Sequence, residues 1–159
     1  MGFALSSMRV TSSAFEHLGP MPAKYTGEGE DVSPPLAWSG APDATRGFAV
    51  ICHDPDAPLV AKNGTYGFVH WVLYNIPGTV SELPEAVKEY TAGKNDFGTA
   101  GYRGPMPPNG HGRHHYYFWV LALNEPTDLP AGLTLWELLE RIEPKVIAMN
   151  RLVGTYERR

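Results

Sequence analysis

The chain has 159 residues, a formal net charge of −4 and a sequence pI near 5.8, which is enough for one domain with a full hydrophobic core. The acidic balance argues against a dedicated nucleic-acid-binding protein, because such proteins present a basic face. The single cysteine, Cys52, excludes an intramolecular disulfide and a cysteine metal cluster. We therefore expect a single domain over residues 1–159 that has no nucleic-acid partner.

The sequence shows no targeting signal. The N-terminus lacks a charged region followed by a long apolar stretch, and no apolar run approaches the length that crosses a bilayer. We therefore expect a cytoplasmic protein without stable membrane insertion.

Short β-rich segments, separated by glycine and proline, follow one another along most of the chain. We expect an edge strand within residues 8–15, a short strand over 36–38, and longer strands over 47–53, 68–76 and 115–123. The last of these is apolar on both faces, which is typical of a central strand. The predicted fold class is mainly β, an antiparallel two-sheet β-sandwich with long ordered loops.

The C-terminal part has helical patterns. Thr134 and Glu137 form a capping box, and apolar residues follow at helical spacing as far as Ile142. Pro144 fits the first turn of a second helix, which we expect over residues 144–152. A last strand is expected at 154–156. Two short C-terminal helices packed on the sandwich complete the predicted fold.

An acidic loop, Asp54-Pro55-Asp56-Ala57-Pro58, follows the expected strand over 47–53. Each residue before a proline is held near extended geometry, and an extended backbone would project Asp54 and Asp56 to the same side. The two prolines also reduce the entropy lost on fixing the loop. The alternative is a proline turn in which the aspartates only accept hydrogen bonds from the local backbone.

Histidines gather beside a second loop, residues 104–116, which is rich in glycine and proline. Strand alternation places His114 and Tyr116 on one face and His115 and Tyr117 on the other. His70 lies within the expected strand over 68–76. Imidazoles beside a carboxylate suit the recognition of an anion, and glycines let backbone N–H groups approach a phosphate-like ligand. The two loops therefore predict one polar pocket.

A metal-dependent hydrolase is the alternative function, because histidines and acids are also ligands of zinc and iron. Its candidate ligands are His53, Asp54, Asp56, His70 and His114. However, strand alternation directs His53 away from Asp54, and the chain has no metalloenzyme spacing such as H-E-x-x-H. The chain also has no G-x-S-x-G motif of a serine hydrolase.

These motifs resemble the phosphatidylethanolamine-binding protein family, also called Raf kinase inhibitor-like proteins, in its bacterial and archaeal branch. The resemblance rests on the acidic loop at 54–58, on Val69-His70-Trp71 and the strand that follows, and on residues 104–116. Supporting matches lie at 24–26, 29–38, 95–98 and 152–156. Together the matches span almost the whole chain in the expected order.

The resemblance implies a small anion pocket at one end of the sandwich, which accepts phosphate, phosphoethanolamine or similar groups in relatives. The residues carried over as its lining are Asp54, His70, His114 and Tyr116, with Asp56, Ala57, Pro58 and Gly104 as its walls. It also implies a binding protein without cofactor, metal or catalytic residues. Relatives suggest a regulatory role, a protein kinase or serine protease as partner, and a homodimer with Tyr90, Phe97 or Trp119 at its interface.

An aspartate in an anion pocket needs an explanation, and two remain open. Asp54 either orients and charges a histidine that then donates to phosphate, or it receives the ammonium group of a zwitterionic ligand. We expect the affinity for phosphate or phosphoethanolamine to fall sharply in His114→Ala and to tighten as the pH drops toward about 6.

Overall fold

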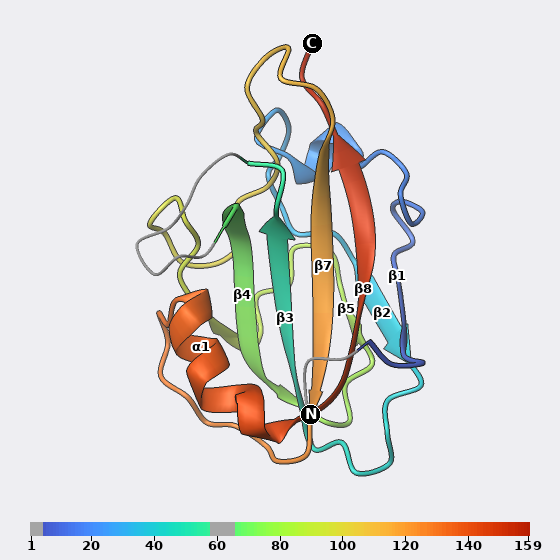
Figure 1. Cartoon of the computed structure of the whole chain (residues 1–159), viewed down its shortest axis with the longest axis vertical. Coiled ribbons are helices and arrows are strands. Elements are labelled where there is room, and N and C mark those ends of the chain that lie inside the picture. Colours follow the sequence, from blue (N-terminus) through green and yellow to red (C-terminus); the bar gives the residue numbers. More distant parts are fainter. Residues whose placement is uncertain (1–4, 58–65) are drawn as a thin grey trace.

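A computed structural model describes residues 5–57 and 66–159. In chain order, its elements are β1 (Arg9–Thr11), η1 (Ala23–Tyr25), β2 (Leu36–Ser39), β3 (Gly47–Asp54), β4 (Phe68–Pro77), β5 (Glu82–Leu83), β6 (Thr91–Ala92), β7 (His114–Leu123), α1 (Leu135–Ile142), η2 (Glu143–Lys145) and β8 (Val146–Tyr156). Among the described residues, the strands form a three-stranded sheet, β1-β2-β5, and a five-stranded sheet, β6-β4-β3-β7-β8 (Figure 1). All pairings between named strands are antiparallel. The predicted two-sheet antiparallel fold is confirmed.

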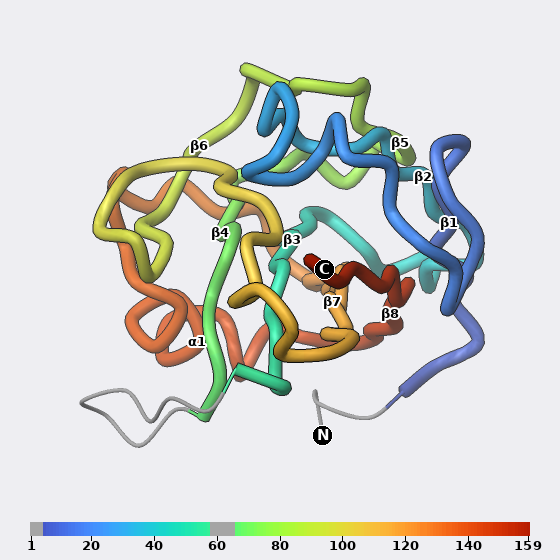
Figure 2. The backbone as a smooth tube through the Cα atoms, turned by 90° about the horizontal axis from the view of Figure 1, so that it is seen from above, coloured from blue at the N-terminus to red at the C-terminus, as the bar shows by residue number. Residues whose placement is uncertain are grey.

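Two apolar layers hold the fold together. One lies between the sheets, where Trp38 of β2 packs on Phe48 of β3 with ring centroids 5.3 Å apart. The other lies on the far face of the five-stranded sheet, which Leu138 and Ile142 of α1 cover. Seen from above, α1 and the small sheet lie on opposite sides of β3 and β7 (Figure 2). β3, β4 and the second half of β7 are therefore buried on both faces, as their continuous apolarity indicates, whereas one face of the first half of β7 is only partly buried.

Most of the predicted elements are confirmed. The strands expected over 36–38, 47–53, 68–76 and 115–123 appear as β2, β3, β4 and β7, whereas the edge strand is only three residues long. The capping box also forms, because Thr134 Oγ1 accepts from the amide of Glu137 at 3.2 Å and Glu137 Oε1 accepts from the amide of Thr134 at 3.0 Å.

The second predicted helix is wrong. Residues 143–145 form one 3₁₀ turn, and the chain then runs as strand β8 from Val146 to Tyr156. Pro144 does begin a helical turn, but β8 pairs with β7 from Leu123↔Val146 to His114↔Tyr156. This long-range pairing outweighs the local preference for a helix. The strand expected at 154–156 is the end of β8.

The sheet order determines where the site lies. Since β3 runs antiparallel to both β4 and β7, the end of β3 meets the beginnings of its two neighbours. Asp54 ends β3, His70 is the third residue of β4, and His114 begins β7. These three side chains therefore come together at one end of the sheet. No helix within residues 5–57 and 66–159 is long and apolar enough to cross a membrane.

Candidate functional site

A cavity of about 300 Å³ opens at this end of the five-stranded sheet. Among the described residues, its polar lining is formed by Asp54, His70, His114 and Tyr116, the four residues expected to line the pocket. The other described lining residues are apolar, namely Ala57, Phe68, Phe97, Met106, Pro107 and Pro108. The two loops singled out in the sequence thus contribute to one cavity, and β4 contributes the third side.

The floor of the cavity holds a buried pair of Asp54 and His114. Asp54 Oδ2 lies 2.7 Å from His114 Nδ1, and the two side chains are 3% and 4% exposed. Asp54 Oδ1 accepts a hydrogen bond of 2.8 Å from the amide of Asp56. Since a carboxylate can only accept, His114 carries its proton on Nδ1 and its ring is fixed in orientation.

The other nitrogen of His114 has a histidine partner that the sequence analysis missed. His111 Nδ1 lies 2.7 Å from His114 Nε2, and the two rings lie 4.9 Å apart. A hydrogen bond between these two nitrogens requires a proton on one of them, and the histidine that carries this proton is the donor. Exposed His111 therefore occupies the hydrogen-bonding position at Nε2 of His114.

His70 is fixed by a hydrogen bond to the backbone. Its Nδ1–H donates to the carbonyl of Arg103 at 2.6 Å, and the amide of Arg103 donates to the His70 carbonyl at 3.1 Å. Burial lowers the pKa of His70, which is 4% exposed, although the Arg103 carbonyl opposes this effect. His70 is therefore held as a neutral ring with its lone pair on Nε2.

Tyr116 completes the polar lining as a hydrogen-bond donor. Its side chain is buried, and its ring meets His70 edge-on at 5.3 Å between centroids. Burial, together with the nearby Asp54 carboxylate, raises the pKa of Tyr116 far above its usual value. The phenol thus keeps its proton throughout the physiological range and can donate it to a ligand oxygen.

An apolar mouth surrounds these polar groups, and the sequence analysis did not predict it. Phe68 and Phe97 meet edge-to-face at 4.7 Å, and Phe97 and Met106 are 42% and 43% exposed. The guanidinium of Arg103 lies 4.8 Å from the Phe97 ring centroid, while its Nε lies 3.1 Å from Asp31 Oδ2. The arginine therefore braces the mouth, and its charge is already paired.

The metal-site alternative receives no geometric support. In the described part of the chain, no group of three or more histidine, cysteine, aspartate or glutamate side chains is placed to hold a metal ion. His53 Nε2 instead lies 2.8 Å from the carbonyl oxygen of Tyr66.

Comparison with known proteins identifies the family. The sequence model of the family described as phosphatidylethanolamine-binding protein matches residues 11–157. The chain belongs to this family. A UPF0098 protein of Pyrococcus abyssi is 42% identical, with 100% of this chain and 90% of the relative covered. That of Methanothermobacter thermautotrophicus is 39% identical, with 95% of this chain and 99% of the relative covered.

Solved structures of phosphatidylethanolamine-binding protein homologues share the fold. A homologue from Chlamydia trachomatis has a TM-score of 0.86 and 37% identity, with 96% of this chain and 98% of that chain covered. Escherichia coli YbcL, described as a member of the mammalian family, has a TM-score of 0.86 and 32% identity, with 97% and 100% covered. The predicted family is therefore confirmed.

The expected wall residues of the phosphatidylethanolamine-binding protein pocket differ in placement. Ala57 lines the cavity, whereas Pro58 lies outside the described residues. The expectation that Asp54 and Asp56 project to one side is wrong, because the chain turns after β3 and the Asp56 amide folds back onto Asp54. Asp56 is exposed and holds His115 instead, with its Oδ2 2.7 Å from both the amide and Nδ1 of that residue.

Gly104 lies behind the lining. Its amide donates to Asp31 Oδ1 at 2.6 Å, and a Cβ at this position would collide with the backbone carbonyl of Tyr25. Glycine is therefore required here for close backbone packing, which holds the loop that carries Met106 and Pro107. Gly104 therefore acts on the cavity through the loop that it braces, whereas Asp56 lies outside the described lining.

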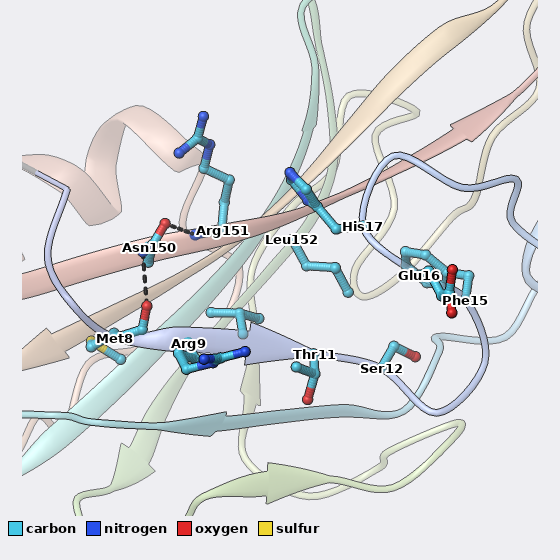
Figure 3. A pocket seen from close by; sticks show the side chains of 11 residues that line it. Met8, Arg9, Thr11, Ser12, Phe15, Glu16, His17, Asn150, Arg151 and Leu152 are labelled. Atoms are coloured by element: carbon cyan, nitrogen blue, oxygen red, sulfur yellow. Dashed lines mark hydrogen bonds between the residues drawn. The ribbon is translucent and has the colours of Figure 1, made fainter.

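A second hollow, of about 450 Å³, lies between β1 and β8 (Figure 3). Asn150 donates from Nδ2 to the carbonyl of Met8 at 2.8 Å and accepts at Oδ1 from the amide of Arg151 at 2.9 Å. His17 Nδ1 accepts from the amide of Val153 at 3.1 Å. The amides of Arg151 and Val153 in β8 are thus satisfied by side chains. The N-terminal part of the chain also pairs with this edge, at Leu5↔Met149 and Pro20↔Thr155, so the edge is covered. None of the predicted site residues lies in this hollow.

Proposed function

We propose that the protein binds a small phosphate-type head group, such as phosphate or phosphoethanolamine, in the cavity between the acidic loop and residues 104–116. The observation that carries this proposal is the buried Asp54–His114 pair on the cavity floor. A carboxylate that holds one nitrogen of an imidazole in a hydrogen bond fixes the ring, so that the other nitrogen can contact an anion. The phenol of Tyr116 is a second donor on the same floor.

The contacts of Asp54 support one of the two explanations for an acid in this pocket. Its Oδ2 is engaged by His114 and its Oδ1 by the amide of Asp56. The carboxylate therefore acts through His114 as an orienting group, and each of its oxygens already has a partner. A charge-assisted hydrogen bond from such a histidine to a phosphate oxygen is about twice as strong as a neutral one.

The role we propose is binding rather than catalysis. The cavity lining within the described residues contains no serine, threonine, cysteine or lysine. Of its other potential nucleophiles, Asp54 is engaged at both oxygens by hydrogen bonds, and burial raises the pKa of the Tyr116 phenol so that it stays protonated. The thiol of Cys52 is fully buried in the sheet, and burial raises its pKa well above the usual value, so it is an inert core residue.

A regulatory partner is the second part of the proposal. A carboxypeptidase Y inhibitor, solved with its cognate proteinase, shares the fold at a TM-score of 0.56 and 16% identity. We propose that this protein likewise inhibits a serine protease or a protein kinase, with occupancy of the cavity controlling the exposed residues at its mouth. Inhibition of carboxypeptidase Y, measured with and without phosphate, tests this part separately from ligand binding.

Calorimetric titration with inorganic phosphate and phosphoethanolamine tests the proposed ligand. We expect saturable binding with one site per chain, and a loss of about tenfold or more in His114→Ala, since a charge-assisted hydrogen bond contributes about 1.5–3 kcal/mol. His115→Ala is the matched control, because this neighbouring histidine faces away and pairs with exposed Asp56. Equal affinity in wild type and His114→Ala, with both proteins folded, would refute the proposal.

A further inference from the structure

We propose that the cavity recognises a proton on its ligand as well as an acidic group. It selects the singly charged, protonated form of a phosphate or phosphonate over an oxyanion of the same charge that carries no proton. This inference rests on the proposed function and names the form of ligand that the same site accepts. His70 recognises this proton, because its Nε2 can accept a hydrogen bond from the ligand.

The hydrogen bond between His70 and Arg103 fixes which nitrogen carries the proton. A backbone carbonyl has no hydrogen to give, so the 2.6 Å contact requires Nδ1–H on His70. The ring is buried at 4% exposure and is enclosed by Phe68 at 4.8 Å and Phe97 at 5.9 Å between centroids. With Nδ1 committed to the backbone, Nε2 is the nitrogen left to face a ligand, and in the neutral ring it accepts.

The charges of the lining residues also favour a singly charged ligand. The described lining residues include one carboxylate, two imidazoles and one phenol, but no lysine or arginine. Two guanidinium groups lie beside the lining, and each is already paired with an acid. That of Arg103 is bonded to Asp31 and lies over the outer ring of Phe97. That of Arg158 donates to the carbonyl of Pro107 at 3.2 Å and lies 3.4 Å from Glu28 Oε2. Even with a proton on His114, the Asp54–His114 pair carries no net charge. A doubly charged anion would therefore meet little compensating charge and a lone pair on His70.

A singly protonated phosphonate matches this arrangement of donors and acceptors. Its P–OH can donate to Nε2 of His70, while its other oxygens accept from Tyr116 and His114. The rings of Tyr116 and His70 lie 5.3 Å apart, and those of Tyr116 and His114 lie 6.4 Å apart. One small tetrahedral group is large enough to contact all three. An ion without a proton leaves the buried acceptor of His70 unsatisfied, which is costly in an enclosed site.

The two probes that isolate this effect are methylphosphonate and methanesulfonate. Both are tetrahedral and methyl-bearing, and at about pH 6.5 both carry mostly one negative charge, but only the phosphonate has an acidic hydrogen. Neither has an ammonium group, so the donor that is tested belongs to the acid itself. We expect wild-type protein to bind methylphosphonate at least about tenfold more tightly than methanesulfonate in calorimetric titrations.

The variant His70→Asn tests whether His70 is the residue that accepts the hydrogen bond from the protonated ligand. The amide nitrogen of asparagine occupies the place of Nδ1 and keeps the bond to Arg103, but nothing occupies the place of Nε2. We expect the variant to reduce the preference for methylphosphonate to about threefold or less, because the acceptor is gone. His53→Asn is the matched control, since His53 lies on a neighbouring strand outside the lining and bonds Tyr66.

The outcomes separate this inference from the proposed function. Equal wild-type affinity for both probes overturns the inference while leaving a phosphate-binding site in place. A preference that is unchanged in a folded His70→Asn overturns the role of His70. If neither probe nor inorganic phosphate binds, the proposed function itself fails and the inference with it. The wild-type comparison stands even if the variant does not fold.

Discussion

Asp54 and His114 lie 60 residues apart in the sequence, yet their side chains meet at 2.7 Å on the cavity floor. The contact joins the end of β3 to the beginning of β7, and both side chains are almost completely buried. It therefore contributes to the stability of the fold and to the orientation of the ligand-facing nitrogen. Both contributions can be measured.

Replacing Asp54 is expected to affect stability and binding together. Asp54→Asn removes the charged acceptor that His114 Nδ1–H faces, and a hydrogen bond to a charged group contributes about 1.5–3 kcal/mol. Asp56→Asn is the matched control, because it breaks an exposed pair with His115, for which at most about 1 kcal/mol is expected. Urea unfolding measures the first effect and phosphate titration the second. Equal losses of stability in the two variants would contradict a special role of the buried pair.

The stability of the protein should depend on pH through His70. Its folded-state pKa lies below the unfolded value of 6.5, so between these two pKa values the unfolded chain binds up to one more proton than the folded chain. The contribution of His70 to stability is therefore present above the unfolded pKa and is lost as the pH falls toward the folded pKa. The loss reaches at most about 1.4 kcal/mol per pH unit.

The variant His70→Asn isolates this effect. Unfolding in urea is compared at about pH 7.5 and about pH 5.5, and the difference between the two values should be smaller in His70→Asn than in wild type. His53→Asn serves as the control for the loss of a histidine outside the cavity. The same difference in wild type and His70→Asn would show that His70 does not titrate as a buried group.

His111 is expected to compete with the ligand. Its Nδ1 lies 2.7 Å from His114 Nε2, where the ligand oxygen must bind in the proposed complex. Removing a competing hydrogen bond of about 1 kcal/mol should tighten phosphate binding about fivefold in His111→Ala. Asn109→Ala, two residues away in the same exposed loop, is the control. Weaker binding in His111→Ala would mean that this histidine contacts the ligand instead of yielding to it.

The reactivity of the Cys52 thiol tests how tightly the core around β3 is closed. Its side chain is 0% exposed within β3, and burial raises the pKa of its thiol well above the usual value. Native protein should not react with a thiol reagent such as dithiobisnitrobenzoate on the time scale of minutes, whereas protein unfolded in urea should react fully with one thiol. Rapid reaction of the native protein would show that β3 opens far more easily than its central position indicates.

The sequence predicts those parts of the site that depend on strand alternation. His114 and Tyr116 share the buried face of β7, while His115 and Tyr117 on the other face are only partly buried. This alternation is local in the pattern of residues, so a single sequence contains it. The common position of Asp54 and His70 is instead implied by the family resemblance, because it depends on the pairing of β3 with β4.

The missed features depend on contacts that no local pattern encodes. The His111–His114 contact requires a loop in which Gly110 and Gly112 have φ angles of 71° and 93°, which only glycine adopts readily. The apolar mouth brings Phe97 and Met106 together from separate loops. Residues after Pro144 fit a helix locally, and only their pairing with β7 makes them a strand.

The central claim is that a phosphate-type group binds at His114, and histidine NMR tests it directly. Long-range proton–nitrogen spectra report the six histidines separately during a titration with phosphoethanolamine. The account predicts saturable shifts of the ring nitrogens of His114, His111 and His70, with little change at His115 and at His17 in the hollow between β1 and β8. Saturable shifts confined to His17 or His115, or no saturable shift at His114, would contradict it.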